Sequence, residues 1–198
     1  MPKSMTSKAF FDLLRRRRPR NAAAIDARIE RDGVTEKTVL MSDSSGFSRK
    51  THDFGILQFL AVMTQCYDKL IPFLKKHRGL CLANNADNIL GLFDDPQDAV
   101  RAAVDMQRWL IRRNKGLPEK EAFNICIGIH HGELIRLSDN VYGETVNVAA
   151  KVGEDLASKD QVLVTDAVKQ RLGRGFKTSY TRSTELGGRT YELHRVLY

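Results

Sequence analysis

The order in which strand-like and helix-like segments follow one another constrains the fold of this chain most. A short apolar strand is predicted over Thr38–Ser42, and apolar residues fall at helical spacing from Gly55 to about His77. Pro72 is expected to kink or divide that helix, because proline lacks the N–H that continues it. The predicted elements that follow are strands Leu80–Ala83 and Ile89–Phe93, a helix from Asp95–Pro96 to about Gly116, strands Phe123–Ile129 and onward to about Arg136, a helix from about Thr145 to Ala157, strand Val162–Thr165, helix Asp166–Leu172, and strands over about 176–180 and 190–197.

This order predicts an α+β fold of the ferredoxin-like, split-βαβ type. We expect a mainly antiparallel sheet with helices packed on one face. The triplet His130-His131-Gly132 is expected to mark a turn between two strands, and Ser44–Ser48 has the composition of a turn. A chain of 198 residues fits one folded domain, predicted over residues 37–198, behind an extension over residues 1–36.

The positive charge of the chain is concentrated at its start. Residues 1–20 contain seven Lys and Arg and a single acid, Asp12, so they carry +6 of the net charge of +8. A solvated arm is the first interpretation, and contact with anionic lipid or nucleic acid is the second. Because the rest of the chain is nearly neutral, the sequence argues against a protein built mainly to bind nucleic acid.

Neither a membrane span nor a disulfide framework is predicted. No run of eighteen or more apolar residues occurs. Cys66, Cys81 and Cys126 lie in apolar segments without C-x-x-C spacing, which is typical of core residues in a reducing compartment. The sequence therefore predicts a cytoplasmic protein.

Two aspartates stand where strands end. Asp43 closes the first predicted strand, and Asp87 lies in the hairpin Asn84–Asn88 between the next two. If the first strand lies beside that hairpin, both carboxylates meet at one edge of the sheet. Carboxylate oxygens are the ligands that Mg²⁺ and Mn²⁺ prefer. Either aspartate alone would be unremarkable, since aspartate is common in turns.

Four segments, in this order, resemble the signature segments of the class III adenylate and guanylate cyclases. They are TVLMSDSSGF, NADNILGLF, IGIHHGE and VYGETVNVAAKVGEDLA, and the resemblance covers about residues 37–197. It implies a nucleotide cyclase catalytic domain, which converts a nucleoside triphosphate to a 3′,5′-cyclic nucleotide and pyrophosphate. It also implies a homodimer with active sites at the interface.

The resemblance assigns roles by position. Asp43 and Asp87 match the two aspartates that bind two Mg²⁺ or Mn²⁺ ions, with the Ser44 carbonyl as a further ligand. Asn147 matches the asparagine that orients the ribose, and Lys151 stands in place of an arginine near the reacting phosphate. The substrate-binding set consists of the backbone N–H groups of Ser45, Gly46, Phe47 and Ser48 and the base-reading positions Ala83 and Asn140. Independently of the resemblance, Arg189 in the turn before the last strand is the best further candidate to reach the triphosphate, with ordinary surface charge as the default interpretation.

The base-reading positions depart from the family pattern. Ala83 stands where adenylate cyclases carry a lysine, and Asn140 where they carry an aspartate. We therefore expect altered base choice, with a slight preference for UTP, as in the bacterial anti-phage pyrimidine cyclases that make cyclic UMP or cyclic CMP. The alternatives are an ordinary adenylate cyclase with other base readers, or a catalytically silent cyclase-like module that binds a nucleotide and regulates a partner.

Overall fold

The structure is a computed structural model that describes residues 5–84 and 87–198. Its strands are β1 (Val34–Ser44), β2 (Leu80–Ala83), β3 (Ile89–Phe93), β4 (Ile125–Arg136), β5 (Val141–Tyr142), β6 (Val162–Thr165), β7 (Lys177–Leu186) and β8 (Arg189–Leu197). Its helices are α1 (Ser7–Arg16), α2 (Ala22–Gly33), α3 (Phe47–Phe54), α4 (Ile56–Lys76), α5 (Pro96–Asn114), α6 (Glu144–Lys151), the π-helical turn η1 (Val152–Leu156) and α7 (Asp166–Lys169).

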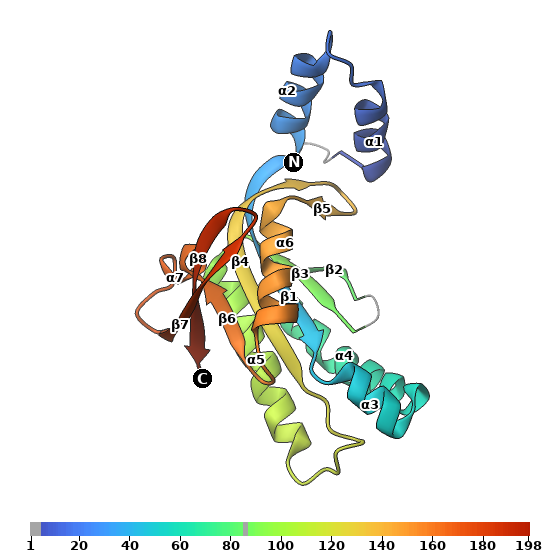
Figure 1. Cartoon of the computed structure of the whole chain (residues 1–198), viewed down its shortest axis with the longest axis vertical. Coiled ribbons are helices and arrows are strands. Elements are labelled where there is room, and N and C mark those ends of the chain that lie inside the picture. The colour runs from blue at the N-terminus through green and yellow to red at the C-terminus, as the bar shows by residue number, and fades with distance from the viewer. Residues whose placement is uncertain (1–4, 85–86) are drawn as a thin grey trace.

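One sheet organises the molecule, in the order β2-β3-β1-β4-β6-β8-β7, with β5 added to β4 (Figure 1). Central strand β1 pairs antiparallel with both β3 and β4. Among the described strands, β4 and β6 form the one parallel pair. The predicted α+β class with an antiparallel-dominated sheet is therefore confirmed.

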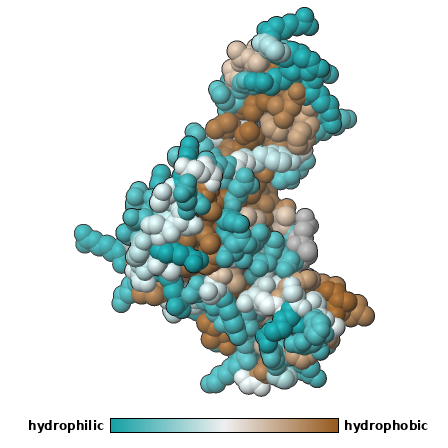
Figure 2. Space-filling view, in the orientation of Figure 1, coloured by the Kyte–Doolittle hydropathy of each residue, from teal (hydrophilic) through white to brown (hydrophobic). Residues whose placement is uncertain are grey.

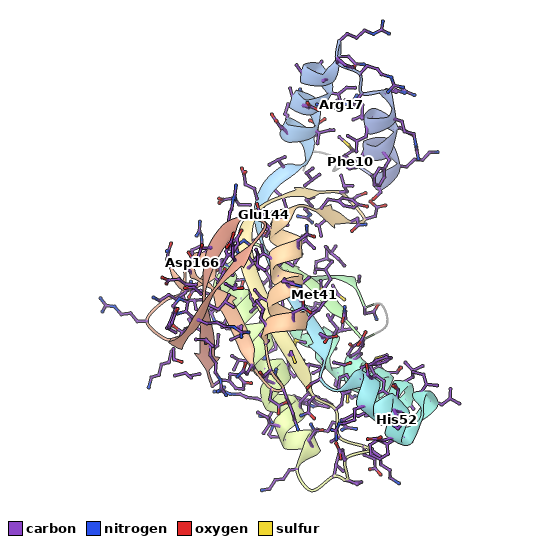
Figure 3. The ribbon with its side chains drawn as sticks, viewed as in Figure 1. Phe10, Arg17, Met41, His52, Glu144 and Asp166 are labelled. Carbon is purple, nitrogen blue, oxygen red and sulfur yellow. The ribbon has the colours of Figure 1, made fainter. Side chains whose placement is uncertain are left out.

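Helices cover both faces of the sheet, so the expectation of helices on one face is wrong. On one face, α4 and α5 bury a large core that includes Leu40 of β1. On the other face, α6 packs over Val39 and Met41 of β1 through Ala149 (Figures 1 and 3). The reason lies in β1 itself, whose consecutive residues Val39, Leu40 and Met41 are all apolar and thus present a buried side chain to each face.

Strand β4 runs through His130-His131-Gly132 without the predicted turn. Each imidazole finds a hydroxyl inside the fold: His130 Nδ1 lies 2.8 Å from Thr165 Oγ1, and His131 Nδ1 lies 2.9 Å from Thr38 Oγ1. Burial lowers the pKa of His130 to about 4, so this side chain is neutral at pH 7. Each of these histidines, within a continuous strand, thus has a hydrogen-bond partner.

The segment after β1 is more helical than predicted. The turn expected over Ser44–Ser48 is limited to residues 45 and 46, and α3 begins at Phe47. Helix α4 continues past Pro72 without being divided. Leu70 and Leu74, on either side of this proline, are fully buried, and their burial offsets the one backbone hydrogen bond that proline cannot make. Of the hairpin predicted over Asn84–Asn88, residues 85 and 86 lie outside the described residues.

The predicted N-terminal extension folds into two helices, and β1 starts within it, at Val34. Phe10 of α1 and Ile29 of α2 pack together with Leu137, which follows β4 (Figure 3). Ser7 also donates two hydrogen bonds to Asp139, from its N–H (2.9 Å) and its hydroxyl (2.8 Å). The basic segment is thus attached to the body through the loop between β4 and β5.

Most of the visible surface is hydrophilic, with hydrophobic residues gathered over α1 and α2 and near the junction of α3 with α4 (Figure 2). At that junction the exposed apolar side chains are Phe54, Ile56 and Leu57. Throughout the part of the chain that the structure describes, every helix is too short or too polar to cross a membrane.

Two glycines allow η1 to lie directly on the sheet. A Cβ on Gly128 of β4 would meet the backbone N of Gly153 at 2.2 Å and the carbonyl O of Ala149 at 2.5 Å. A Cβ on Gly153 would meet the carbonyl O of Met41 at 2.7 Å. Because the opposing atoms are backbone, a side chain at either position could be accommodated only by moving α6 and η1 away from β1 and β4.

We therefore expect Gly128→Ala to lower the free energy of unfolding by about 3 kcal/mol, because the added Cβ meets backbone atoms. Gly175→Ala is the matched control, because a Cβ on Gly175 meets nothing within 4 Å. The control should stay within about 0.5 kcal/mol of the wild type. Urea unfolding followed by circular dichroism measures both, and equal stability of the two variants would contradict the close packing.

Candidate functional site

The fold brings Asp43 and Asp87 together, as the sequence predicts. Strand β1 pairs with β3 up to the Ser42–Ile89 pair, so Asp43 comes one residue after this pair on β1 and Asp87 two residues before it. Burial and the neighbouring Asp87 carboxylate raise the pKa of Asp43 to about 7. The Asp87 carboxylate is thus close enough to oppose the ionisation of Asp43.

Two contacts that the sequence does not reveal hold Asp87 in place. The hydroxyl of Ser44 donates to Asp87 Oδ2 over 3.0 Å. The phenol of Tyr67, on α4, donates to the backbone carbonyl of Asp87. From sequence, Tyr67 is only one of the apolar positions of a helix, and its hydroxyl gives no signal of this partner.

The carboxylate pair fits a divalent cation. Two hard oxygen donors that repel each other at neutral pH gain from an ion between them, and Mg²⁺ and Mn²⁺ bind through one or two carboxylates plus substrate phosphates. Across residues 5–84 and 87–198, no group of three or more His, Cys, Asp and Glu side chains is arranged to hold a metal ion. A cation bound at this pair would have the two aspartates as side-chain ligands and would take its remaining positions from other oxygen donors.

Next to this pair, the start of α3 offers backbone donors. Gly46 precedes the helix with a φ of 83°, and no side chain caps the first turn. The N–H groups of Phe47 and Ser48 have no intrahelical acceptor, and the helix start favours an anion. Ser45 differs, because its N–H donates to the Asn124 carbonyl over 2.9 Å. The predicted cradle over Ser45–Ser48 is thus reduced by one donor.

Asn147 and Lys151 are both exposed on α6, one turn apart. They line a pocket of about 310 Å³ together with Leu186 and Gly187 of the β7–β8 hairpin. The ammonium group of Lys151 forms an ion pair with Asp155. Among the described residues of this single chain, neither side chain forms a hydrogen bond or ion pair with Asp43 or Asp87.

Of the remaining predicted positions, Asn140 and Arg189 belong to elements away from the aspartates, and Ala83 precedes the connection that carries Asp87. Asn140 is in the β4–β5 turn, where its amide donates to the Tyr142 hydroxyl over 3.0 Å. Arg189 begins β8 and forms an ion pair with Glu144 at 3.2 Å, beside a pocket of about 490 Å³ that Asp166 also lines (Figure 3). Ala83 ends β2 opposite Leu90, one residue before the connection that carries Asp87.

Glu154 is a site residue that sequence reasoning missed. It lies on η1, and its Oε1 accepts a hydrogen bond of 2.9 Å from the amide of Asn88, the neighbour of Asp87. Burial raises the pKa of Glu154, and the charges of Asp155 and Asp87 raise it further. From the sequence, Glu154 is expected to be an ordinary acidic residue on a helix surface. The π-helical turn that brings it towards Asp87 has no clear sequence signal.

Comparison with known proteins gives one consistent result. Residues 34–197 match the family described as the adenylate and guanylate cyclase catalytic domain. Serine/threonine-protein kinase pkn2 of Myxococcus xanthus is 33% identical over 147 residues, which are 72% of this chain and 17% of that protein. Putative adenylate cyclase 3 of Rhizobium meliloti (strain 1021) is 26% identical over 132 residues, 67% of this chain and 22% of that protein. This chain thus spans about a fifth of the length of these curated relatives.

The fold also matches a solved structure. The adenylyl cyclase CyaB from P. aeruginosa superimposes with a TM-score of 0.72, at 16% sequence identity. The match covers 83% of this chain and 95% of the CyaB chain. At that identity the likeness establishes a shared fold.

The carboxylate pair predicts a metal-dependent change in stability. At pH 8, Mn²⁺ at about 100 times its dissociation constant should stabilise the wild type by about 2.7 kcal/mol. Asp43→Asn and Asp87→Asn should lose most of this gain. Without metal, Asp43→Asn should itself be stabilising at pH 8, because the Asp43 carboxyl, with its pKa raised to about 7, is charged there and uncharged at pH 5.

Because Asp43 is only partly buried, we expect that gain to be about 1 kcal/mol at pH 8, to shrink as the pH falls below about 7, and to vanish only near the ordinary carboxyl pKa of 3.8. Asp68→Asn, on the exposed side of α4, is the control and should behave as the wild type. Thermal unfolding with and without Mn²⁺ measures these effects. A full Mn²⁺ response in both site variants would place the metal elsewhere.

Proposed function

The chain belongs to the adenylate and guanylate cyclase catalytic domain family, and we propose that it acts as a nucleotide cyclase. The proposed reaction converts a nucleoside triphosphate to a 3′,5′-cyclic nucleotide and pyrophosphate. The observation that carries the proposal is the juxtaposition of Asp43 and Asp87, with the pKa of Asp43 raised to about 7. A perturbed acid beside a second acid is a common feature of catalytic sites.

The proposed roles follow from the chemistry. The 3′ hydroxyl of the ribose attacks the α-phosphate, and pyrophosphate leaves. Asp43 and Asp87, with the Ser44 carbonyl, would hold two Mg²⁺ or Mn²⁺ ions, which when bound supply charge neutralisation and a lower pKa for the attacking hydroxyl. The N–H groups of Phe47 and Ser48 would bind phosphate oxygens at the start of α3.

The positions of Asn147 and Lys151 support a dimer. In one chain these side chains point into a pocket of their own, bounded by the β7–β8 hairpin. A head-to-tail homodimer would place them opposite the aspartates of the other subunit. There Asn147 would orient the ribose, and Lys151 would stabilise the charge that develops on the phosphates in the transition state. Arg189, one residue beyond the tip of the same hairpin, would reach the triphosphate.

We propose that this site lacks the side chains that usually recognise a purine base. Ala83 offers no side-chain hydrogen bond, whereas the Asn140 amide can both donate and accept. A site that lacks its hydrogen-bonding groups discriminates weakly between bases. We propose poor selection of ATP over GTP and a slight preference for UTP, as in the anti-phage pyrimidine cyclases.

A second candidate is a catalytically silent module, and one contact favours it. Lys151 is paired with Asp155 on its own chain. A lysine that kept this partner would be less available to the reacting phosphate. In addition, an ammonium group lacks the planar fork with which arginine binds phosphate. Such a module would bind a nucleotide and regulate a partner without forming product.

Turnover assays with ATP, GTP, CTP and UTP, separately and in competition, test the activity and the base choice together. With Mn²⁺, the wild type should form cyclic product, and Asp43→Ala or Asp87→Ala should reduce the rate at least about 1000-fold, or about 4 kcal/mol. Asp68→Ala is the control. Strong preference for ATP would overturn the proposed base choice, and no product from any triphosphate would favour the silent module.

Mixing two inactive variants tests the shared site. Asp43→Ala lacks one half of the site, and Asn147→Ala lacks the other. Mixed dimers should therefore contain one intact site, and an equimolar mixture should regain up to about a quarter of the wild-type rate under random subunit exchange. Exchange is followed by energy transfer between labelled subunits. Complete exchange without recovered activity would contradict sites shared between subunits.

A further inference from the structure

The carboxylate of Glu154 is placed by an interruption in the helix that precedes it. Helix α6 ends at Lys151 and the chain continues as the π-helical turn η1, from Val152 to Leu156. Within this turn, Gly153 lies against the backbone of β1 and β4. The next residue, Glu154, accepts a hydrogen bond from the Asn88 amide over 2.9 Å. The π-helical turn thus anchors one residue on the sheet and directs the next towards the β2–β3 connection.

Asn88 and Asp87 are adjacent, so whatever holds one restricts the other. Three contacts reach this pair from three different elements. Tyr67 of α4 binds the carbonyl of Asp87, Ser44 of β1 binds its carboxylate, and Glu154 of η1 binds the side chain of Asn88. Among these contacts, the Glu154 hydrogen bond is the one that connects Asp87 to the segment following Asn147 and Lys151.

Glu154 is near the aspartates but does not complete a metal cluster with them. Its charge contributes to the raised pKa of Asp43, which shows that it lies within electrostatic reach of that carboxylate. Yet in the described part of the chain no three acidic or other ligating side chains are arranged around one ion position. The geometry of Glu154 is therefore that of a residue that supports a ligand and does not itself bind the ion.

We propose that Glu154 is a positioning residue that, through Asn88, holds Asp87 in the orientation required to bind a divalent cation. The inference rests on the proposed function, because it takes Asp43 and Asp87 as the metal ligands. Residues that orient a metal ligand in this way commonly change metal affinity 10- to 100-fold when mutated. The Glu154–Asn88 hydrogen bond is exposed, so we expect an effect at the lower end of this range.

Mn²⁺ affinity tests the proposal without relying on turnover. The free-ion electron paramagnetic resonance signal is titrated at pH 8 with the full chain and no nucleotide. Glu154→Ala should weaken Mn²⁺ binding about 10-fold. Glu154→Gln should stay within about threefold of the wild type, because its amide oxygen can accept the same hydrogen bond from Asn88. Glu185→Ala, an exposed acid on β7, is the control and should bind as the wild type.

A double-mutant cycle separates positioning from charge. Asn88→Ala should weaken Mn²⁺ binding about as much as Glu154→Ala, and adding Glu154→Ala to Asn88→Ala should have no further effect. Additive losses, or an equal loss in Glu154→Gln and Glu154→Ala, would show that Glu154 acts by charge alone and would overturn the proposal. Unchanged affinity in Glu154→Ala would also overturn it. A wild type that binds no Mn²⁺ would overturn the assigned metal pair, and this inference with it.

Discussion

The contact between Gly128 and Gly153 is the constraint on which the arrangement of the site depends. It lets backbone pack on backbone, with a Cβ at either position brought within 3 Å of main-chain atoms. Movement of η1 along or away from the sheet would break this contact. The contact therefore fixes the distance and the orientation of α6 relative to β1 and β4. Asn147 and Lys151 are thereby presented outward, and Glu154 is directed towards the connection that carries Asp87.

The carboxyl groups of Asp43 and Asp87 lie close together at this rigid part of the fold, and their proximity lowers the stability of the folded chain. A half-buried Asp43 with its pKa raised to about 7 costs stability at neutral pH, and a smaller neutral side chain would avoid that cost. The surrounding residues fix the pair in place nonetheless: the Ser44 hydroxyl and the Tyr67 phenol both bind Asp87. Such local conflict, held by specific contacts, is typical of sites where function opposes stability.

The sequence predicts well those features that local pattern determines. Strands Leu80–Ala83, Ile89–Phe93 and Val162–Thr165 have the predicted bounds, and helix α5 begins at Pro96, within the predicted start Asp95–Pro96. Features set by tertiary partners are missed: His130 contacts a hydroxyl 35 residues away, and Glu154 accepts a hydrogen bond from an amide 66 residues away. The approach of Asp43 to Asp87 is predicted because it requires only that two neighbouring strands pair.

Lys151 has an ion-pair partner within its own chain, and the proposed dimer requires it to contact the triphosphate bound by the other subunit. In one chain its ammonium group is paired with Asp155, four residues later on the same side of the helix. An exposed pair of this kind contributes little stability, so exchanging it for phosphate oxygens costs little. A triphosphate carries several negative charges and would outcompete one carboxylate, particularly where water is excluded at an interface. The intrachain pair is therefore compatible with a lysine that is held near its working position until the substrate of the other subunit arrives.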